Sequence, residues 1–406
     1  MFGTARTGSN LKIFVSAGDV SGDRQAAALV STLRQLRPEL EVWAIGGSAL
    51  AEAGAEIWLD SRWAAVMGAA AALGKAPVLI PQLLKIRKRL ESQRPAVAVL
   101  VDWGGVNVRL ARWLRRRAIP TLYYLPPRSW DRQARRDVAF TVDAIATQFP
   151  WSKHILSGGV ARVEWVGHPL VDQVQPRLSK AEAAAALGLD WRRATVALLP
   201  GSRKAEIGHC LPVLLAAAAQ IERAIPGTQF LLAASEAAQR LGDRLDKAIR
   251  ARGLKVTVLQ GMDYDALRCA DAAAAVSGTA TLELALLGVP MVILYRGSLG
   301  AWLQYEIARR TTRPLRFFGL PNLVADRAIV TELLQRQASA ERIAAEIVAL
   351  LSDQERNRRM KAELAAVCRQ LGPPGAIRRT AEMVLDLAAY GSYAPLLQPA
   401  GAGMDR

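Results

Sequence analysis

The chain has 406 residues, of which 51% are hydrophobic and 6% aromatic, and its formal net charge is +17. This length exceeds what one hydrophobic core usually supports, and the apolar content is too high for a disordered chain, so we expect two folded domains. The cysteines Cys210, Cys269 and Cys368 lie far apart without C-x-x-C spacing, which predicts neither a disulfide framework nor a zinc site and favours a reducing compartment. No signal peptide and no run of about 18 apolar residues is visible, so we expect no membrane span.

The first part of the chain alternates short apolar runs with longer helical patterns, which is typical of strand-helix-strand units. We expect these units to build a doubly wound, Rossmann-like α/β domain over residues 1–170. Its predicted strands are residues 11–17, 41–47, 96–102, 121–126 and 144–149.

Two loops of this domain follow predicted strands and carry candidate site residues. In VSAGDVSGD (15–23), Gly18 and Gly22 give backbone freedom and Ser21 is expected to cap the next helix, so the loop is a candidate ligand site. Asp102 ends the strand before WGGVN, and a carboxylate at the carboxyl end of a parallel strand is a candidate general base. Capping of the following helix explains Asp102 equally well.

Residues 76–94 form an amphipathic pattern, apolar on one side and basic on the other. Between residues 75 and 136 the chain has fifteen basic and three acidic side chains, a net charge of +12. The pattern suits a helix lying in the interface of an anionic membrane, and it equally suits a core-packed helix with a solvated basic face. The side chains expected to face the membrane are Val78, Leu79, Ile80, Leu83, Lys85, Arg87 and Lys88.

The strand-helix alternation restarts after a hinge at about residues 168–190 and predicts a second Rossmann-like domain over residues 171–374. A helix at about 375–392 is expected to pack back on the first domain, and residues 393–406 to form a frayed tail. The strands predicted in the second domain are residues 194–201, 228–234, 256–261, 272–277 and 291–296.

Two strand-to-helix junctions of the second domain suggest a phosphate site. Ser277, Gly278 and Thr279 would form the first turn of a helix whose N–H groups and partial positive charge attract phosphate, with Glu283 within reach of a neighbouring sugar hydroxyl. An ordinary helix cap with Glu283 as its capping-box partner explains the same residues. In LLPGSRKAEI (198–207), Arg203 is a natural phosphate ligand, and the two junctions together predict a nucleotide diphosphate site.

GMDYDAL (261–267) offers a pair of carboxylates, Asp263 and Asp265, at metal-binding spacing. Capping of the next helix by Asp263 is the better explanation, so we expect no metal. The three histidines are too scattered for a metal site or a catalytic triad, and among them His168 stands in the passage between the domains.

These stretches together resemble the lipid-A-disaccharide synthase family, inverting glycosyltransferases of the two-domain GT-B fold. The resemblance is carried in chain order by AGDVSGD (17–23), AVMG (65–68), VDWGGVN (101–107), GHP (167–169), LLPGSRKAEI (198–207), SGTATLE (277–283), PMVILYR (290–296) and LPNLVADRAIVTELLQ (320–335). It implies two domains facing each other across a cleft. It also implies transfer of a diacylated glucosamine from a UDP-linked donor to diacylglucosamine 1-phosphate (lipid X), giving a β-1,6-linked disaccharide and UDP without a metal or other cofactor.

The resemblance also assigns roles to residues at matching positions. Asp102 would be the essential carboxylate. The donor-binding residues would be Gly201, Ser202, Arg203, Met262, Ser277, Gly278, Thr279, Glu283 and Asn322. The acceptor side would contain Gly18, Ser21, Gly22, Met67 and Asn107. The implied partners are the two lipid substrates, an anionic membrane surface at the inner face of the cytoplasmic membrane and a second copy of the chain, with no nucleic acid.

Departures from the family pattern lie in the acceptor half: Asp19 where the family has Glu, Gly104 to Val106 after Asp102, and PPRSWDR at 126–132. They keep a second possibility open, a divergent relative that uses a UDP-sugar with another acceptor. A UDP-sugar epimerase of the same fold would work without any acceptor. A basic protein that binds nucleic acid or anionic membranes without activity would bind in a salt-dependent manner indifferent to UDP.

Overall fold

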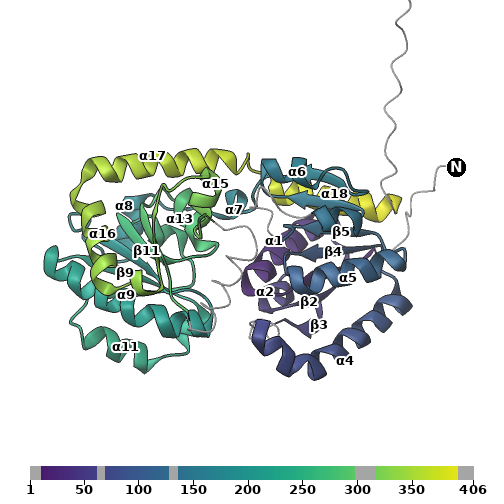
Figure 1. Ribbon diagram of the computed structural model, residues 1–406, viewed down its shortest axis with the longest axis horizontal. Coiled ribbons are helices and arrows are strands. Elements are labelled where there is room, and N and C mark those ends of the chain that lie inside the picture. The colour runs from purple at the N-terminus through teal and green to yellow at the C-terminus, as the bar shows by residue number, and fades with distance from the viewer. Residues whose placement is uncertain (1–10, 62–68, 128–135, 298–315, 392–406) are drawn as a thin grey trace, which may run out of the picture. The chain divides into compact units, whose positions relative to one another are not determined.

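The computed structural model describes residues 11–61, 69–127, 136–297 and 316–391. The chain divides into two compact units (Figure 1). Unit 1 comprises residues 1–169 together with 372–406, and unit 2 comprises residues 170–371. The last helix that the structure describes therefore belongs to the same unit as the first described strand.

Unit 1 is built on a sheet of seven parallel strands in the order β3-β2-β1-β4-β5-β6-β7. The inner strands are almost completely buried, because helices cover both faces of the sheet. The strands are β1 (Lys12–Ala17), β2 (Glu41–Gly46), β3 (Glu56–Asp60), β4 (Val97–Val101), β5 (Thr121–Tyr124), β6 (Ala144–Thr147) and β7 (Arg162–Trp165).

Side chains of β1 alternate between two hydrophobic clusters, one on each face of this sheet. Ile13 and Val15 belong to one cluster, and Phe14 between them belongs to the other. Figure 1 shows the helices that flank the sheet. The first cluster is closed by α1 (Val20–Leu36), α2 (Ser48–Glu52) and α18 (Ala376–Tyr390), and the second by α4 (Ala69–Gln93), α5 (Gly104–Arg116), η1 (Arg136–Phe140) and α6 (Pro150–Leu156).

Unit 2 contains a sheet of six parallel strands in the order β10-β9-β8-β11-β12-β13 around its own hydrophobic core. The strands are β8 (Thr195–Leu199), β9 (Gln229–Ala234), β10 (Val256–Gln260), β11 (Ala272–Val276), β12 (Met291–Tyr295) and β13 (Thr331–Leu334). The helices are α7 (Leu170–Gln173), α8 (Lys180–Ala186), α9 (Lys204–Ala224), α10 (Glu236–Gln239), α11 (Asp243–Arg250), α12 (Tyr264–Leu267), α13 (Ala280–Leu286), α15 (Leu320–Ala325), η2 (Gln335–Gln337), α16 (Ala340–Ser352) and α17 (Gln354–Gln370).

The two doubly wound sheets confirm the predicted fold class, and all ten predicted strands are present. The sequence did not predict β3, β7 and β13, each of which lies at the edge of its sheet. Edge strands are partly exposed and lack a continuous apolar run, so their sequences resemble those of loops. Among the described helices, none combines the length and hydrophobicity needed to cross a bilayer.

Candidate active site

Each sheet has a topological switch point, where neighbouring strands are followed by chain that leaves in opposite directions. In unit 1 the switch lies between β1 and β4, and in unit 2 between β8 and β11. Ligands of open α/β sheets bind at the carboxyl ends of the strands at such points. The loops that follow β1, β4, β8 and β11 contain most of the candidate site residues.

Asp102 follows β4 in a strained backbone conformation. Its φ is 47° and that of Trp103 is 49°, both in the left-handed region that non-glycine residues rarely adopt. The Tyr123 hydroxyl donates to the Asp102 carbonyl at 2.7 Å, and the Asp102 amide donates to the Tyr124 carbonyl at 3.1 Å. Trp103 is the N-cap residue of α5, so the interpretation of Asp102 as the helix cap is wrong.

Burial and the neighbouring charge of Asp102 raise the pKa of Tyr123, and the phenol therefore stays protonated as a donor. The Tyr123 hydroxyl thus acts as a hydrogen-bond donor to the backbone of Asp102 and does not exchange a proton with the Asp102 carboxylate. Sequence reasoning missed Tyr123, although its place in the strand beside β4 could have suggested it.

Asn107 is completely buried and ties the ends of β1 and β4 together. Its Oδ1 accepts from the Ser16 hydroxyl at 2.7 Å. Its Nδ2 lies 3.1 Å from the Ser16 and Val101 carbonyl oxygens and 3.2 Å from that of Asp102. Asn107 thus joins the two loops of the unit 1 switch point, and its acceptor-side role stays a prediction.

Gly18 lies directly under the indole of Trp103. A Cβ atom at Gly18 would stand 1.9 Å from Trp103 Cδ2, so only glycine fits. The expectation that Ser21 caps α1 is wrong: Asp19 is the N-cap, and its Oδ1 accepts from the Gly22 amide at 2.7 Å. Met67 lies outside the described residues.

The loop after β8 in unit 2 turns at Gly201, whose φ is +97°. Arg203 is the N-cap residue of α9, and its Nη1 lies 2.7 Å from Glu206 Oε1. The other oxygen of Glu206 accepts from the amides of Ser202 and Arg203, each at 3.2 Å. Glu206 was not among the predicted site residues, although its place three positions after the cap is capping-box spacing.

The loop after β11 contains Ser277, Gly278 and Thr279. The Ser277 hydroxyl donates to the Phe318 carbonyl at 2.7 Å. Apart from the chain neighbours of Gly278, no heavy atom of the described residues lies within 4 Å of the position that a Cβ at Gly278 would take. Glu283 is only 2% exposed, and its Oε1 accepts from the Tyr264 hydroxyl at 2.7 Å. Thr279 is the N-cap of α13 without a side-chain cap hydrogen bond, so the capping-box interpretation of this loop is wrong.

Asn322 is buried in unit 2, and its side chain makes four hydrogen bonds to Ile329, Val330 and Glu332 in the described structure. Its Oδ1 accepts from the amides of Ile329 and Val330 at 2.8 and 2.9 Å. Its Nδ2 donates to the Val330 carbonyl at 2.9 Å and to Glu332 Oε1 at 2.8 Å. The side chain shapes the turn between α15 and β13, and Met262 packs against the core of the same unit.

The two aspartates of the segment 263–265 have separate structural partners. Asp263 is the N-cap of α12 and accepts from the Ala266 amide at 3.0 Å, as expected. Asp265 Oδ1 accepts from the amides of Arg177 and Leu178 at 2.7 and 2.8 Å. Within the part of the chain that the structure describes, no group of three or more potential metal ligands occurs.

Helix α4 carries the predicted membrane-facing residues. Ile80 and Leu84, one turn apart, are 54% and 50% exposed, and Lys85 and Lys88 are exposed beside them. Leu83 packs partly against the core of unit 1, and the Arg87 guanidinium lies 5.5 Å from the centre of the Trp113 ring. The side chains of Val78 and Leu79 lie outside the described part of the helix.

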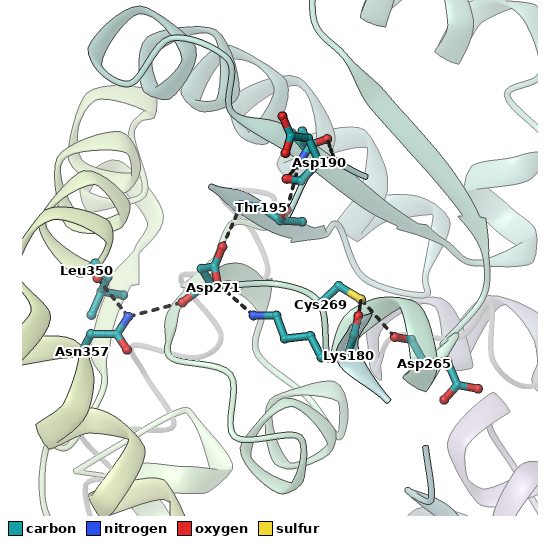
Figure 2. Close-up of polar contacts among 9 residues, drawn as sticks. Lys180, Asp190, Thr195, Asp265, Cys269, Asp271, Leu350 and Asn357 are labelled. Atoms are coloured by element: carbon teal, nitrogen blue, oxygen red, sulfur yellow. Dashed lines mark hydrogen bonds and ion pairs between the residues drawn. The ribbon is translucent and has the colours of Figure 1, made fainter. Parts of the chain in front are cut away.

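A hydrogen-bond network with structural roles lies at the amino ends of β8 and β11 in unit 2 (Figure 2). Asp271, just before β11, accepts from Lys180 Nζ at 2.9 Å and from the Thr195 amide at 3.0 Å. Asn357 Nδ2 joins the carbonyls of Asp271 and Leu350 at 3.4 and 2.9 Å. These groups satisfy one another where β8 and β11 begin, away from the strand ends at which ligands bind.

Comparison with known proteins gives the family. Residues 13–385 match the family model described as lipid-A-disaccharide synthetase. A lipid-A-disaccharide synthase from Geobacter sulfurreducens is 38% identical over 378 residues, which are 93% of this chain and 97% of that relative. This chain belongs to the lipid-A-disaccharide synthase family. The family consists of hexosyltransferases of lipid A biosynthesis, so the predicted enzyme class is confirmed.

Solved structures at low sequence identity have the same fold as this chain. MurG from Acinetobacter baumannii has a TM-score of 0.54 and 15% identity, with 93% of this chain and 100% of that chain covered. A UDP-GlcNAc 2-epimerase from Neisseria meningitidis bound to UDP-GlcNAc has a TM-score of 0.56 and 13% identity, with 92% and 100% covered. The GT-B fold class is thereby confirmed.

Proposed function

We propose that the protein condenses UDP-2,3-diacylglucosamine with 2,3-diacylglucosamine 1-phosphate to lipid A disaccharide 1-phosphate and UDP, with inversion and without a metal. The observation that carries the proposal is the family match, which extends over residues 13–385 and so includes both units. A relative that shared only the donor unit would leave the acceptor open, whereas this match includes the loop of Asp102.

In this proposal unit 2 binds the donor. Arg203 forms charge-assisted hydrogen bonds with the diphosphate, the loop Ser277–Thr279 lies against it, and Glu283 accepts from a ribose hydroxyl. The open space at Gly278 supports this arrangement, because a phosphate can approach the backbone there. Met262, Gly201 and Ser202 complete the surroundings, and Asn322 acts through the turn that it shapes.

Unit 1 provides the base. The acceptor hydroxyl is a poor nucleophile at neutral pH, and Asp102 removes its proton as the oxygen attacks the anomeric carbon of the donor. The bond from that carbon to the diphosphate breaks on the opposite face, which inverts the configuration and releases UDP. The strained backbone at Asp102 and Trp103 supports this role, because such strain persists where surrounding contacts fix a functional group.

The acylated substrates require a lipid surface, and we propose that α4 provides the contact. Ile80 and Leu84 are exposed apolar side chains, and Lys85 and Lys88 complement anionic headgroups at the inner face of the cytoplasmic membrane. Changing Ile80 and Leu84 together to Ser should release the protein from anionic vesicles and leave UDP affinity unchanged. Unchanged vesicle binding would reject α4 as the contact.

The experiment that tests the function is UDP release from the purified protein with both lipid substrates. We expect UDP and disaccharide in equal amounts, and no UDP without the acceptor. UDP formed with donor alone would contradict the transferase proposal. Light scattering in the same buffer would test whether the active form is a homodimer.

The proposed donor site can be tested by measuring UDP affinity after substitution of Arg203, with a control substitution on the same helix. Arg203→Ala should weaken UDP binding about 10- to 100-fold, since a charge-assisted hydrogen bond contributes about 1.5–3 kcal/mol. Arg223→Ala, in the last turn of the same helix, is the control and should bind UDP as the parent does. Equal affinity of Arg203→Ala and parent in calorimetry would remove Arg203 from the site.

A further inference from the structure

The segment 263–265 after β10 is anchored at three points, one through each of its residues. Asp263 caps α12, and Asp265 holds the backbone of Arg177 and Leu178. Between them, Tyr264 donates its hydroxyl to Glu283 Oε1 at 2.7 Å, on a different helix nineteen residues further along the chain. The two aspartates therefore fix a segment whose central side chain contacts the candidate donor site.

Glu283 needs such a partner because it is 2% exposed. A buried carboxylate without hydrogen bonds is strongly disfavoured, and a well-placed donor restricts the rotation of such a carboxylate. The phenol of Tyr264 can donate one hydrogen bond, and a carboxylate has about four lone-pair positions. Glu283 can thus accept from Tyr264 and from a ligand hydroxyl at the same time.

We propose that Tyr264 is a positioning residue for ribose recognition: its hydroxyl holds the Glu283 carboxylate in the orientation that accepts from a ribose hydroxyl of the uridine diphosphate group. The inference rests on the proposed function, since it assumes a UDP-linked donor in unit 2. It adds the first residue of α12 to the candidate donor site, which already includes Met262 from the loop before that helix. Tyr264 itself does not touch the ribose.

The test is a binding cycle with UDP, 2′-deoxy-UDP and 3′-deoxy-UDP, measured by calorimetry on the full chain. In the parent, at least one deoxy analogue should bind about 10- to 100-fold more weakly than UDP, the range for a hydrogen bond to a charged group. In Tyr264→Phe this ratio should fall below about threefold, because UDP loses affinity and the deoxy analogue does not. Tyr390→Phe, at a 69% exposed tyrosine of unit 1, should keep the parent's ratio.

Glu283→Gln separates positioning from a general loss of structure. If Tyr264 acts through Glu283, the double variant Tyr264→Phe with Glu283→Gln should discriminate no less than Glu283→Gln alone. A parent-like ratio in Tyr264→Phe, with UDP still bound, would overturn the role of Tyr264 and leave the proposed function intact. A parent that binds no UDP would overturn both.

Discussion

The loops at the two switch points obtain their shapes in different ways. In unit 1 the left-handed backbone falls on Asp102 and Trp103, whereas in unit 2 it falls on Gly201. Glycine adopts this conformation without steric cost, while a non-glycine residue there costs on the order of 1–3 kcal/mol. The unit 1 loop is therefore held by its surroundings, above all by the buried Asn107.

The glycines of the two switch points also differ in how closely other side chains pack against them. Gly18 is covered by the indole of Trp103, whereas an added Cβ at Gly278 meets nothing within 4 Å among the described residues beyond its chain neighbours. Unit 1 thus holds the backbone that carries Asp102 by close packing, and the described part of unit 2 leaves room beside the backbone at Gly278. This difference fits a unit that supplies a reactive group and a unit that binds a diphosphate.

The largest effect is expected from Asp102 itself. Asp102→Asn keeps the size of the side chain and removes its basicity, so turnover should fall about 10²- to 10⁴-fold while UDP affinity stays near that of the parent. Steady-state kinetics with both lipid substrates and calorimetry with UDP measure the two quantities. Full turnover in Asp102→Asn would place the base elsewhere and remove the functional reason for the strained loop.

The paired glycines give the second test. Gly18→Ala should destabilise the protein by about 1–3 kcal/mol, because the new methyl group collides with Trp103, and Gly278→Ala should change stability by less than about 0.5 kcal/mol. Denaturant unfolding measures both. Adding Trp103→Ala should remove most of the cost of Gly18→Ala, since it removes the collision.

Ligand binding should reverse the order of the two glycine variants. Gly278→Ala should weaken UDP binding, because its methyl group occupies the space open to phosphate, and Gly18→Ala should leave UDP affinity unchanged. Equal UDP affinity for Gly278→Ala and parent would show that the open space at Gly278 is not part of the donor site.

The strand-loop-helix junctions that carry the site were predictable because their signals are local. An apolar run followed by Gly and Ser is visible at 198–203 and 272–278, and Asp263 was correctly assigned as a cap. Contacts between distant segments have no such signal. The pairing of Tyr264 with Glu283 depends on the sheet topology, which brings together two helices, α12 and α13, that are separate in the chain.

Side chains that stabilise the fold through internal hydrogen bonds were also not predictable from the sequence. Asn322 belongs to the motif LPNL. Its hydrogen bonds, however, are made to Val330 and Glu332, and only the folded structure brings these residues next to it. Ser21 was expected to be a cap because serine is a good one, but the helix begins one residue after Asp19, which is also a good cap. A difference of two residues in a helix start is beyond the resolution of sequence patterns.

The smallest expected effect concerns a third loop at the same edge of unit 1, where His168 follows β7. Burial next to Phe149 lowers the pKa of His168 from 6.5 to about 3, whereas His209 of unit 2 is exposed. Below pH 6.5 the unfolded chain binds a proton at this histidine and the folded chain does not. Stability is therefore complete above pH 6.5 and falls by about 1.4 kcal/mol per pH unit as the pH drops toward 3.

His168→Gln should remove this contribution. In denaturant unfolding between pH 7 and pH 5, the variant should lose less stability than the parent by about 1.4 kcal/mol for each pH unit below 6.5. His209→Gln is the control and should follow the parent. Because the comparison uses the slope with pH, a constant loss of stability from the substitution does not affect it. Parallel slopes for His168→Gln and parent would mean that His168 is protonated in the folded protein, and the close packing found at Gly18 and Asn107 would then not extend to this third loop of unit 1.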